Sequence, residues 1–208
     1  YDGKNLSEYG DVVVVTVNHR LNVLGYLDVS EYGEDYQYSG NCGTADMIAS
    51  LQWVKENIAN FGGDPDNVTI FGQSGGGGKI ISMLATPEAE GLFNQAIVQS
   101  GSERYIEKDT AKKITEKTLE ILGITDNQIE QLKEVPYDTL DAAATEALKQ
   151  VGEELGTSIS WRPVLDEDYI QSNFQEWTND IPVMVGSVFG EMNCWTALDP
   201  NETNKNSW

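Results

Sequence analysis

The segment Val68-Thr-Ile-Phe-Gly-Gln-Ser-Gly-Gly-Gly77 decides the fold of this chain. It predicts a short buried strand over residues 68–71, a G-x-S-x-G turn, and a helix over residues 76–84. A serine at such a strand-to-helix turn is held with its Oγ exposed, and the next amide points into the same space. Ser74 is therefore the candidate nucleophile, and the Gly75 N–H is a candidate oxyanion donor.

The segments on either side of this turn predict an α/β sheet. Asp11 to Asn18 is a near-continuous β-branched run, which is typical of a parallel strand buried on both faces. A helix is predicted over 44–61, where apolar residues recur at alternating steps of four and three. Gln95 to Gln99 predicts a further strand. This alternation of strands and helices is typical of a mostly parallel sheet flanked by helices. The apolar stripe of the helix consists of Met47, Leu51, Val54, Ile58 and Phe61.

The sequence changes character after Tyr105. An amphipathic helix is predicted over 109–122, followed by a capping box at Thr125 and another helix from Pro136 to about residue 151. Residues 181–187 then return to the sheet. We therefore expect one domain, residues 1–208, in which about 106–180 form a helical insertion.

Composition limits the function classes. The chain has 208 residues, enough for one sizeable core, and a net charge of −21 from 13 basic and 34 acidic residues. This charge argues against binding to nucleic acid or to an anionic membrane. No apolar run is long enough to cross a membrane. We expect a well-solvated acidic surface; a cytoplasmic location is slightly favoured, and secretion stays open.

The cysteines and the histidine give no metal signature. Cys42 and Cys194 are the only cysteines, and they lie far apart in the sequence. We expect two free thiols, and a disulfide between them is the alternative. With His19 as the only histidine, no cluster has the spacing of metal ligands. We expect neither a metal nor another cofactor.

Seven ordered stretches make the chain resemble the type-B carboxylesterase and cholinesterase-like family of α/β-hydrolases, and within it the para-nitrobenzyl-esterase-like members. The close resemblance covers residues 11–102 and implies an α/β-hydrolase fold that hydrolyses esters through a serine acyl-enzyme. In the family, insertions such as residues 106–180 form a cap over the site. The seven stretches are Val12-Val-Val-Val-Thr-Val-Asn-His-Arg-Leu21, Gly25-Tyr-Leu27, Asn41-Cys-Gly-Thr-Ala-Asp46, Leu51-Gln-Trp-Val-Lys-Glu-Asn-Ile58, Phe61-Gly-Gly-Asp-Pro-Asp-Asn-Val-Thr-Ile-Phe-Gly72, Gly91-Leu-Phe93 and Gln99-Ser-Gly101.

The resemblance also suggests a triad acid. Glu191 follows the strand at 181–187, where the family has Asp-Glu-Gly with the Glu as acid; here Gly190 precedes it and Met192 follows it. An ordinary loop carboxylate is the alternative. Ser100 matches a family position near the triad, and a polar strand end explains it equally well.

Further positions vary the family pattern. Gln73 replaces the usual Glu before the serine, which removes a charge beside the nucleophile, and Gly75 replaces Ala while keeping the N–H. Gly72 and Gly76 flank the turn, where we expect an added Cβ to clash. Asp46 is expected to cap a helix or to pair with Arg20 rather than to act in chemistry.

The catalytic base has no candidate in this sequence. His19 stands where the family usually has Tyr, before the nucleophile, and we interpret it as structural. We therefore expect a central fragment, incomplete at both ends, whose catalytic His and glycine-rich oxyanion loop lie outside it. Alone it should be nearly inactive, because removing the base costs orders of magnitude in rate.

Two functions stay open at this point. The first is hydrolysis of small, neutral, rather apolar esters. The alternative is a non-catalytic cholinesterase-like module that acts in binding or adhesion. An incomplete sheet would leave unpaired edges, so association through those edges is also expected.

Overall fold

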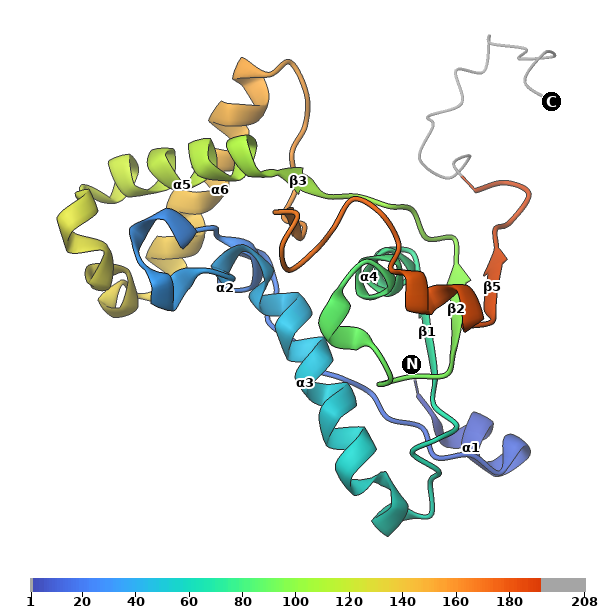
Figure 1. Ribbon diagram of the computed structural model, residues 1–208. Coiled ribbons are helices and arrows are strands. Elements are labelled where there is room, and N and C mark those ends of the chain that lie inside the picture. The colour runs from blue at the N-terminus through green and yellow to red at the C-terminus, as the bar shows by residue number, and fades with distance from the viewer. Residues whose placement is uncertain (1, 192–208) are drawn as a thin grey trace, which may run out of the picture.

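The computed structural model describes residues 2–191. The strands are β1 (Thr69–Gln73), β2 (Gln95–Gln99), β3 (Ile106–Glu107), β4 (Val164–Leu165) and β5 (Val183–Gly186). The α-helices are α1 (Lys4–Gly10), α2 (Asn22–Tyr26), α3 (Cys42–Asn57), α4 (Gly75–Leu84), α5 (Lys108–Leu122) and α6 (Tyr137–Glu154). Figure 1 shows two parts, one built on the sheet β1, β2 and β5 with α4, the other on α2, α5 and α6.

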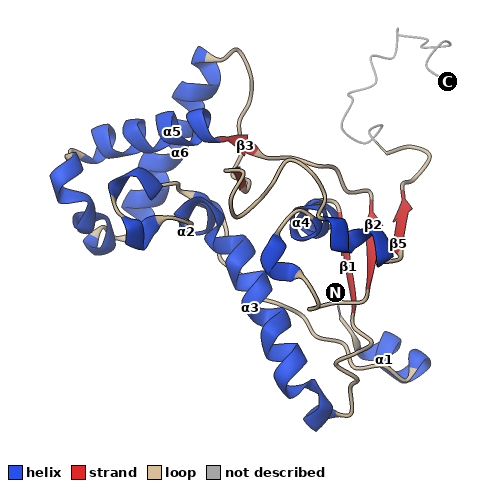
Figure 2. Ribbon diagram, in the orientation of Figure 1, coloured by secondary structure: helices blue, strands red, loops and turns tan. Residues whose placement is uncertain are grey.

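The central sheet has the order β1-β2-β5, and all its pairs are parallel. Thr69 pairs with Gln95, and Ala96 pairs with Val183. This confirms the three sheet segments predicted around residues 68–71, 95–99 and 181–187. Helix α4 connects β1 to β2 and packs on the sheet (Figure 2). The core between them includes Ile70, Ile80, Met83, Leu84, Phe93 and Val98.

The apolar stripe of α3 is confirmed for four of its five residues, because Met47, Leu51, Val54 and Ile58 are buried. Phe61 is 62% exposed and packs against Trp53, with ring centroids 5.7 Å apart. The α-helix ends at Asn57, and a 3-10 turn spans Ile58–Phe61. Because a 3-10 turn advances fewer residues per turn, it rotates Phe61 away from the buried face.

The strand predicted over 11–18 is wrong for the described residues. The segment has no regular secondary structure and belongs to neither sheet, and it follows the short helix α1. Val12, Val13, Val15 and Val17 are 42–46% exposed. A run of β-branched residues has a high strand propensity, but a strand also needs a neighbouring strand with which to form hydrogen bonds.

Residues 106–180 are mainly helical, as predicted. Helices α5 and α6 pack on each other, and α5 ends at Gly123, whose φ of 68° is left-handed. Between them, Thr125 and Gln128 form the predicted capping box at the start of the 3-10 segment Asp126–Glu134. Strands β3 and β4 form a two-stranded parallel sheet at the base of α5. No helix among residues 2–191 has the length and apolar character needed to cross a membrane.

Candidate active site

Ser74 occupies a strained turn between β1 and α4. Its φ of 55° and ψ of −116° lie outside the regions that non-glycine residues normally adopt. The Ser74 N–H donates to the Gln99 carbonyl at 2.8 Å, and the Ser74 carbonyl accepts from the Gly78 N–H at 3.0 Å. Sheet and helix thus hold this backbone in place while the side chain stays exposed. Such strain is characteristic of functional positions.

The glycines make this turn sterically feasible. A Cβ on Gly72 would lie 2.5 Å from the carbonyl carbon of Gly76, so the predicted clash is confirmed at Gly72. The same prediction is wrong at Gly76, where nothing lies within 4 Å of an added Cβ. The turn places the backbone of Gly76 against Gly72, so of these two positions only residue 72 has no room for a side chain. A Cβ on Gly77 would likewise meet Gly101 Cα at 2.8 Å, so the helix packs closely on the end of β2.

The neighbours of Ser74 are accessible as well. Gly75 is the first residue of α4 and is exposed, so its N–H is among the amides that have no carbonyl partner within the helix. The helix dipole places positive potential at this end. Gln73 is the exposed last residue of β1 and pairs in register with Gln99. The Gly75 amide is thus positioned where negative charge could be stabilised.

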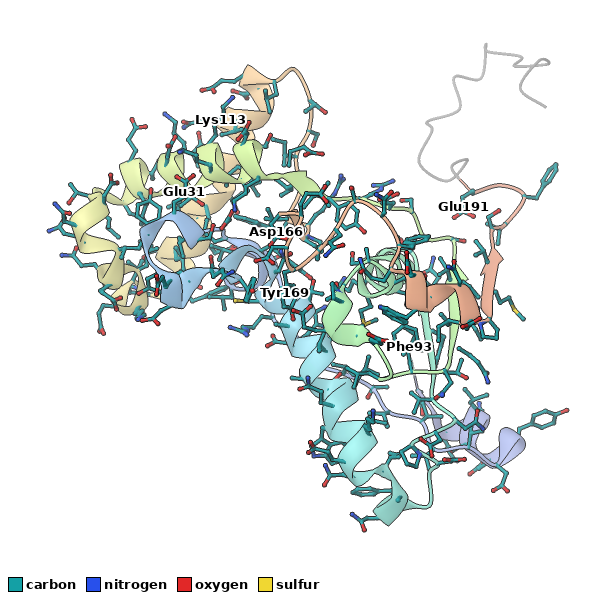
Figure 3. All side chains as sticks on the ribbon, viewed as in Figure 1. Glu31, Phe93, Lys113, Asp166, Tyr169 and Glu191 are labelled. Atoms are coloured by element: carbon teal, nitrogen blue, oxygen red, sulfur yellow. The ribbon has the colours of Figure 1, made fainter. Side chains whose placement is uncertain are left out.

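Ser100 and Glu191 lie together at the ends of the next two strands. The Ser100 N–H donates to the Gly186 carbonyl at 2.7 Å, and Ser100 Oγ donates to Glu191 Oε2 at 3.0 Å. The same carboxylate oxygen accepts the Val188 N–H at 2.8 Å. Figure 3 shows Glu191 just beyond β5. Ser74, Ser100 and Glu191 therefore follow β1, β2 and β5 at the carboxyl edge of one parallel sheet, where α/β proteins place their sites.

The predicted pairing of Arg20 with Asp46 is confirmed. Arg20 Nε and Nη2 donate to the two carboxylate oxygens at 2.8 and 2.6 Å, and the Arg20 N–H adds a third bond of 2.8 Å. These bonds hold the pKa of Asp46 below its ordinary value. Asp46 is fully engaged by this ion pair, which joins α3 to the segment before α2.

His19 is half-buried. Burial lowers its pKa, the Lys79 ammonium lowers the pKa further, and the Asp46 carboxylate opposes both. Its Nε2 is buried and has no hydrogen-bond partner within residues 2–191. Sequence reasoning assigned no role to Lys79, whose Nζ lies 3.8 Å from the position of a Cβ on Gly75. The one signal available was its place one helical turn after Gly75.

The described residues hold no group of three or more His, Cys, Asp or Glu side chains suited to a metal ion. Cys42 is a free thiol, and burial raises its pKa. The second predicted free thiol, Cys194, lies outside the described residues.

Known proteins share the sequence family and the fold of this chain. The model of the carboxylesterase family matches residues 1–207. The para-nitrobenzyl esterase of Bacillus subtilis (strain 168) is 39% identical over 196 residues, which are 92% of this chain and 40% of that protein. The solved structure of a PNB esterase superposes with a TM-score of 0.85 at 37% identity, covering 96% of this chain and 43% of the other.

A second structure is more similar in sequence. It is an esterase from the anaerobe Clostridium hathewayi that can hydrolyze aliphatic aromatic polyesters, with 48% identity, a TM-score of 0.82, and coverage of 91% of this chain and 39% of that one. The chain thus spans about two fifths of the length of these relatives. On these matches and on its parallel sheet with flanking helices, the chain belongs to the carboxylesterase family and has an α/β-hydrolase fold.

Proposed function

We propose that the protein hydrolyses carboxylic esters, with Ser74 as the nucleophile. The observation that carries this proposal is the backbone of Ser74, whose φ of 55° and ψ of −116° are retained between β1 and α4 at an energetic cost. A serine in an ordinary loop has no reason to adopt this conformation. In a nucleophile elbow it exposes Oγ at the edge of the sheet.

The reaction proceeds in two steps. Ser74 Oγ attacks the ester carbonyl and loses its proton to a base, and the tetrahedral oxyanion accepts a hydrogen bond from the Gly75 N–H. The base then returns the proton to the departing alcohol, which leaves an acyl-enzyme. Water attacks the acyl group by the same route and releases the acid and Ser74.

Glu191 is proposed as the acid that orients the base. Its carboxylate is held at the sheet edge by the Ser100 hydroxyl and the Val188 amide, which fix its position. The base is proposed to be a histidine outside this sequence. His19 is unsuited to the role, because burial and the Lys79 ammonium lower its pKa and so disfavour the imidazolium that a catalytic base must form.

The substrates are proposed to be small, neutral, rather apolar esters. The family and the names of the relatives support esters as the class, and the small, neutral and apolar character rests on the family resemblance alone. The net charge of −21 would in addition repel anions at long range. The chain is proposed to be one domain in which residues 106–180 act as a cap. No cofactor enters these steps.

Turnover of p-nitrophenyl butyrate by the complete gene product tests the proposal. We expect Ser74→Ala to lose activity by several orders of magnitude. The matched control is Ser50→Ala on α3, whose hydroxyl bonds only its own helix at Met47, and its turnover should be native-like. A native protein without turnover, or a Ser74→Ala protein that keeps it, would favour a non-catalytic binding module.

A further inference from the structure

Two of the three arginines in this chain have no carboxylate partner among residues 2–191. Arg20 makes the bidentate pair with Asp46, whereas Arg104 and Arg162 take part in no ion pair of the described residues. The chain has 34 acidic residues and a net charge of −21, so acidic partners are plentiful. Even Glu103, next to Arg104 in the chain, forms no ion pair with either arginine in this part of the structure. Two guanidinium groups are thus left uncompensated.

Strand pairing brings these two arginines side by side. Strands β3 and β4 are parallel, with Ile106 opposite Val164, and the Ile106 N–H donates to the Pro163 carbonyl at 2.9 Å. Arg104 and Arg162 each stand two residues before this pair, on the segments that lead into the two strands. Because parallel strands keep a constant register, Arg104 and Arg162 are expected to stand opposite each other.

The two arginines make the same local hydrogen bond. Arg104 Nε donates to Ser102 Oγ at 2.8 Å, and Arg162 Nε donates to Ser160 Oγ at 3.2 Å. A Ser-x-Arg sequence is therefore repeated in register on two neighbouring segments. Each serine engages the Nε–H and leaves the two Nη groups of its guanidinium available, which are donors suited to carboxylate or phosphate.

The proximity of the two groups is also visible in their electrostatics. Arg162 is half-buried, and burial lowers its pKa; the positive charge of Arg104 lowers the pKa further. Holding two like charges together without an ion-pair partner among the described residues costs free energy. A bound anion would remove this cost.

We propose that Arg104 and Arg162 form a binding site for a small oxyanion, either a carboxylate or a phosphate. The site lies where the chain passes from the carboxyl edge of the sheet, after Ser100, to the helical part (Figure 1). The anion has two conceivable sources. It is a free ion or metabolite, or it is the free carboxylate of an ester substrate; this second source rests on the proposed ester hydrolysis and extends its substrates from neutral esters to esters that carry a carboxylate.

Direct binding tests the site without reference to catalysis. Isothermal titration of the complete gene product with inorganic phosphate and with succinate should give a Kd on the order of 1 mM or tighter for at least one of them. Arg104→Gln and Arg162→Gln should each weaken binding about tenfold, because each removes one charge-assisted contact.

Lys113→Gln is the matched control, since it removes one positive charge from the exposed face of α5 (Figure 3) and should leave the Kd unchanged. Arg104 is exposed, so Arg104→Gln should also keep the native melting temperature without anion. An absence of binding to the native protein, or equal binding by all three variants, would overturn the proposal.

Kinetics then identify the source of the anion. We compare p-nitrophenyl hemisuccinate, which carries a carboxylate, with neutral p-nitrophenyl butyrate. A rise of about tenfold in KM for the hemisuccinate alone in Arg104→Gln supports the site with the substrate as the source. Unchanged KM values together with weakened phosphate or succinate binding support it with a free anion. Binding that persists in a protein that hydrolyses neither ester would refute the proposed function and leave the oxyanion site intact.

Discussion

Replacing Ser74 by glycine or by alanine measures the strain on which the nucleophile assignment rests. Both variants lack Oγ, so they differ only in their backbone preference. Alanine must keep the φ of 55° and ψ of −116° at the same cost as serine, whereas glycine adopts such angles freely. We therefore expect Ser74→Gly to be more stable than Ser74→Ala.

The size of the difference follows from two opposing contributions. A residue held in a sparsely populated backbone region costs on the order of 1–3 kcal/mol, and glycine removes that cost. Glycine also loses about 0.5–1 kcal/mol relative to alanine, because its unfolded chain is more flexible. The net expectation is that Ser74→Gly exceeds Ser74→Ala by about 1 kcal/mol in free energy of unfolding, or roughly 2–4 °C in Tm.

Denaturant unfolding of the two variants gives the difference directly, and the same pair of substitutions at Ser50 is the control. Ser50 lies within α3, where glycine is less favourable than alanine by about 1 kcal/mol, so the sign should reverse. If Ser74→Gly proved no more stable than Ser74→Ala, the turn would be unstrained and the argument for a nucleophile elbow would fail.

Three other predictions concern the surrounding structure. Gly72→Ala should lower the free energy of unfolding by about 1–3 kcal/mol in denaturant melts, because its Cβ meets the backbone of Gly76, whereas Gly76→Ala should be tolerated; equal effects would contradict the steric account. Arg20 lowers the pKa of Asp46 in the folded state. The ion pair therefore stabilises the protein at any pH above the pKa of an ordinary carboxyl group, and this stabilisation is lost as the pH falls through the lowered pKa of the folded state. Asp46→Asn should therefore be less stable by about 1 kcal/mol near pH 7 and should show less acid destabilisation in unfolding series down to about pH 3; a native-like pH profile would refute this. Met184 in β5 is 66% exposed on an edge strand, so the isolated chain should associate in sedimentation experiments and Met184→Lys should reduce association; a native monomer at all concentrations would contradict it.

The fold was predictable wherever local signals agreed with long-range pairing. The sheet strands around Ile70, Val98 and Val185 combine β-branched residues with turn signals, and the helices of residues 108–154 begin or end at Pro136, Thr125 and Gly123. The segment 11–18 has the same local preference for a strand, yet it lacks a partner among the described residues. Strand propensity depends on the local sequence, whereas the hydrogen bonds of a sheet require a second strand that is distant in the sequence. The residues of the segment alone therefore do not distinguish a paired strand from an unpaired one.

The candidate site was predictable in its residue types more than in its contacts. The strand-to-helix turn identifies Ser74 and Gly75, because only a few residue types permit that backbone. The hydrogen bond between Ser100 and Glu191 joins residues 91 positions apart and depends on the pairing of β2 with β5, which no local pattern encodes. The approach of Lys79 to His19 depends in the same way on how α4 packs.

Covalent labelling of Ser74 tests the central claim most directly. The complete gene product is treated with a fluorophosphonate, digested, and examined by peptide mass spectrometry, with Ser74→Ala and Ser50→Ala beside it. The account predicts one phosphonylated peptide, which contains Ser74, is retained in Ser50→Ala and disappears in Ser74→Ala. An unlabelled native protein, or a label on another serine, would contradict the assignment of Ser74 as the nucleophile of an esterase.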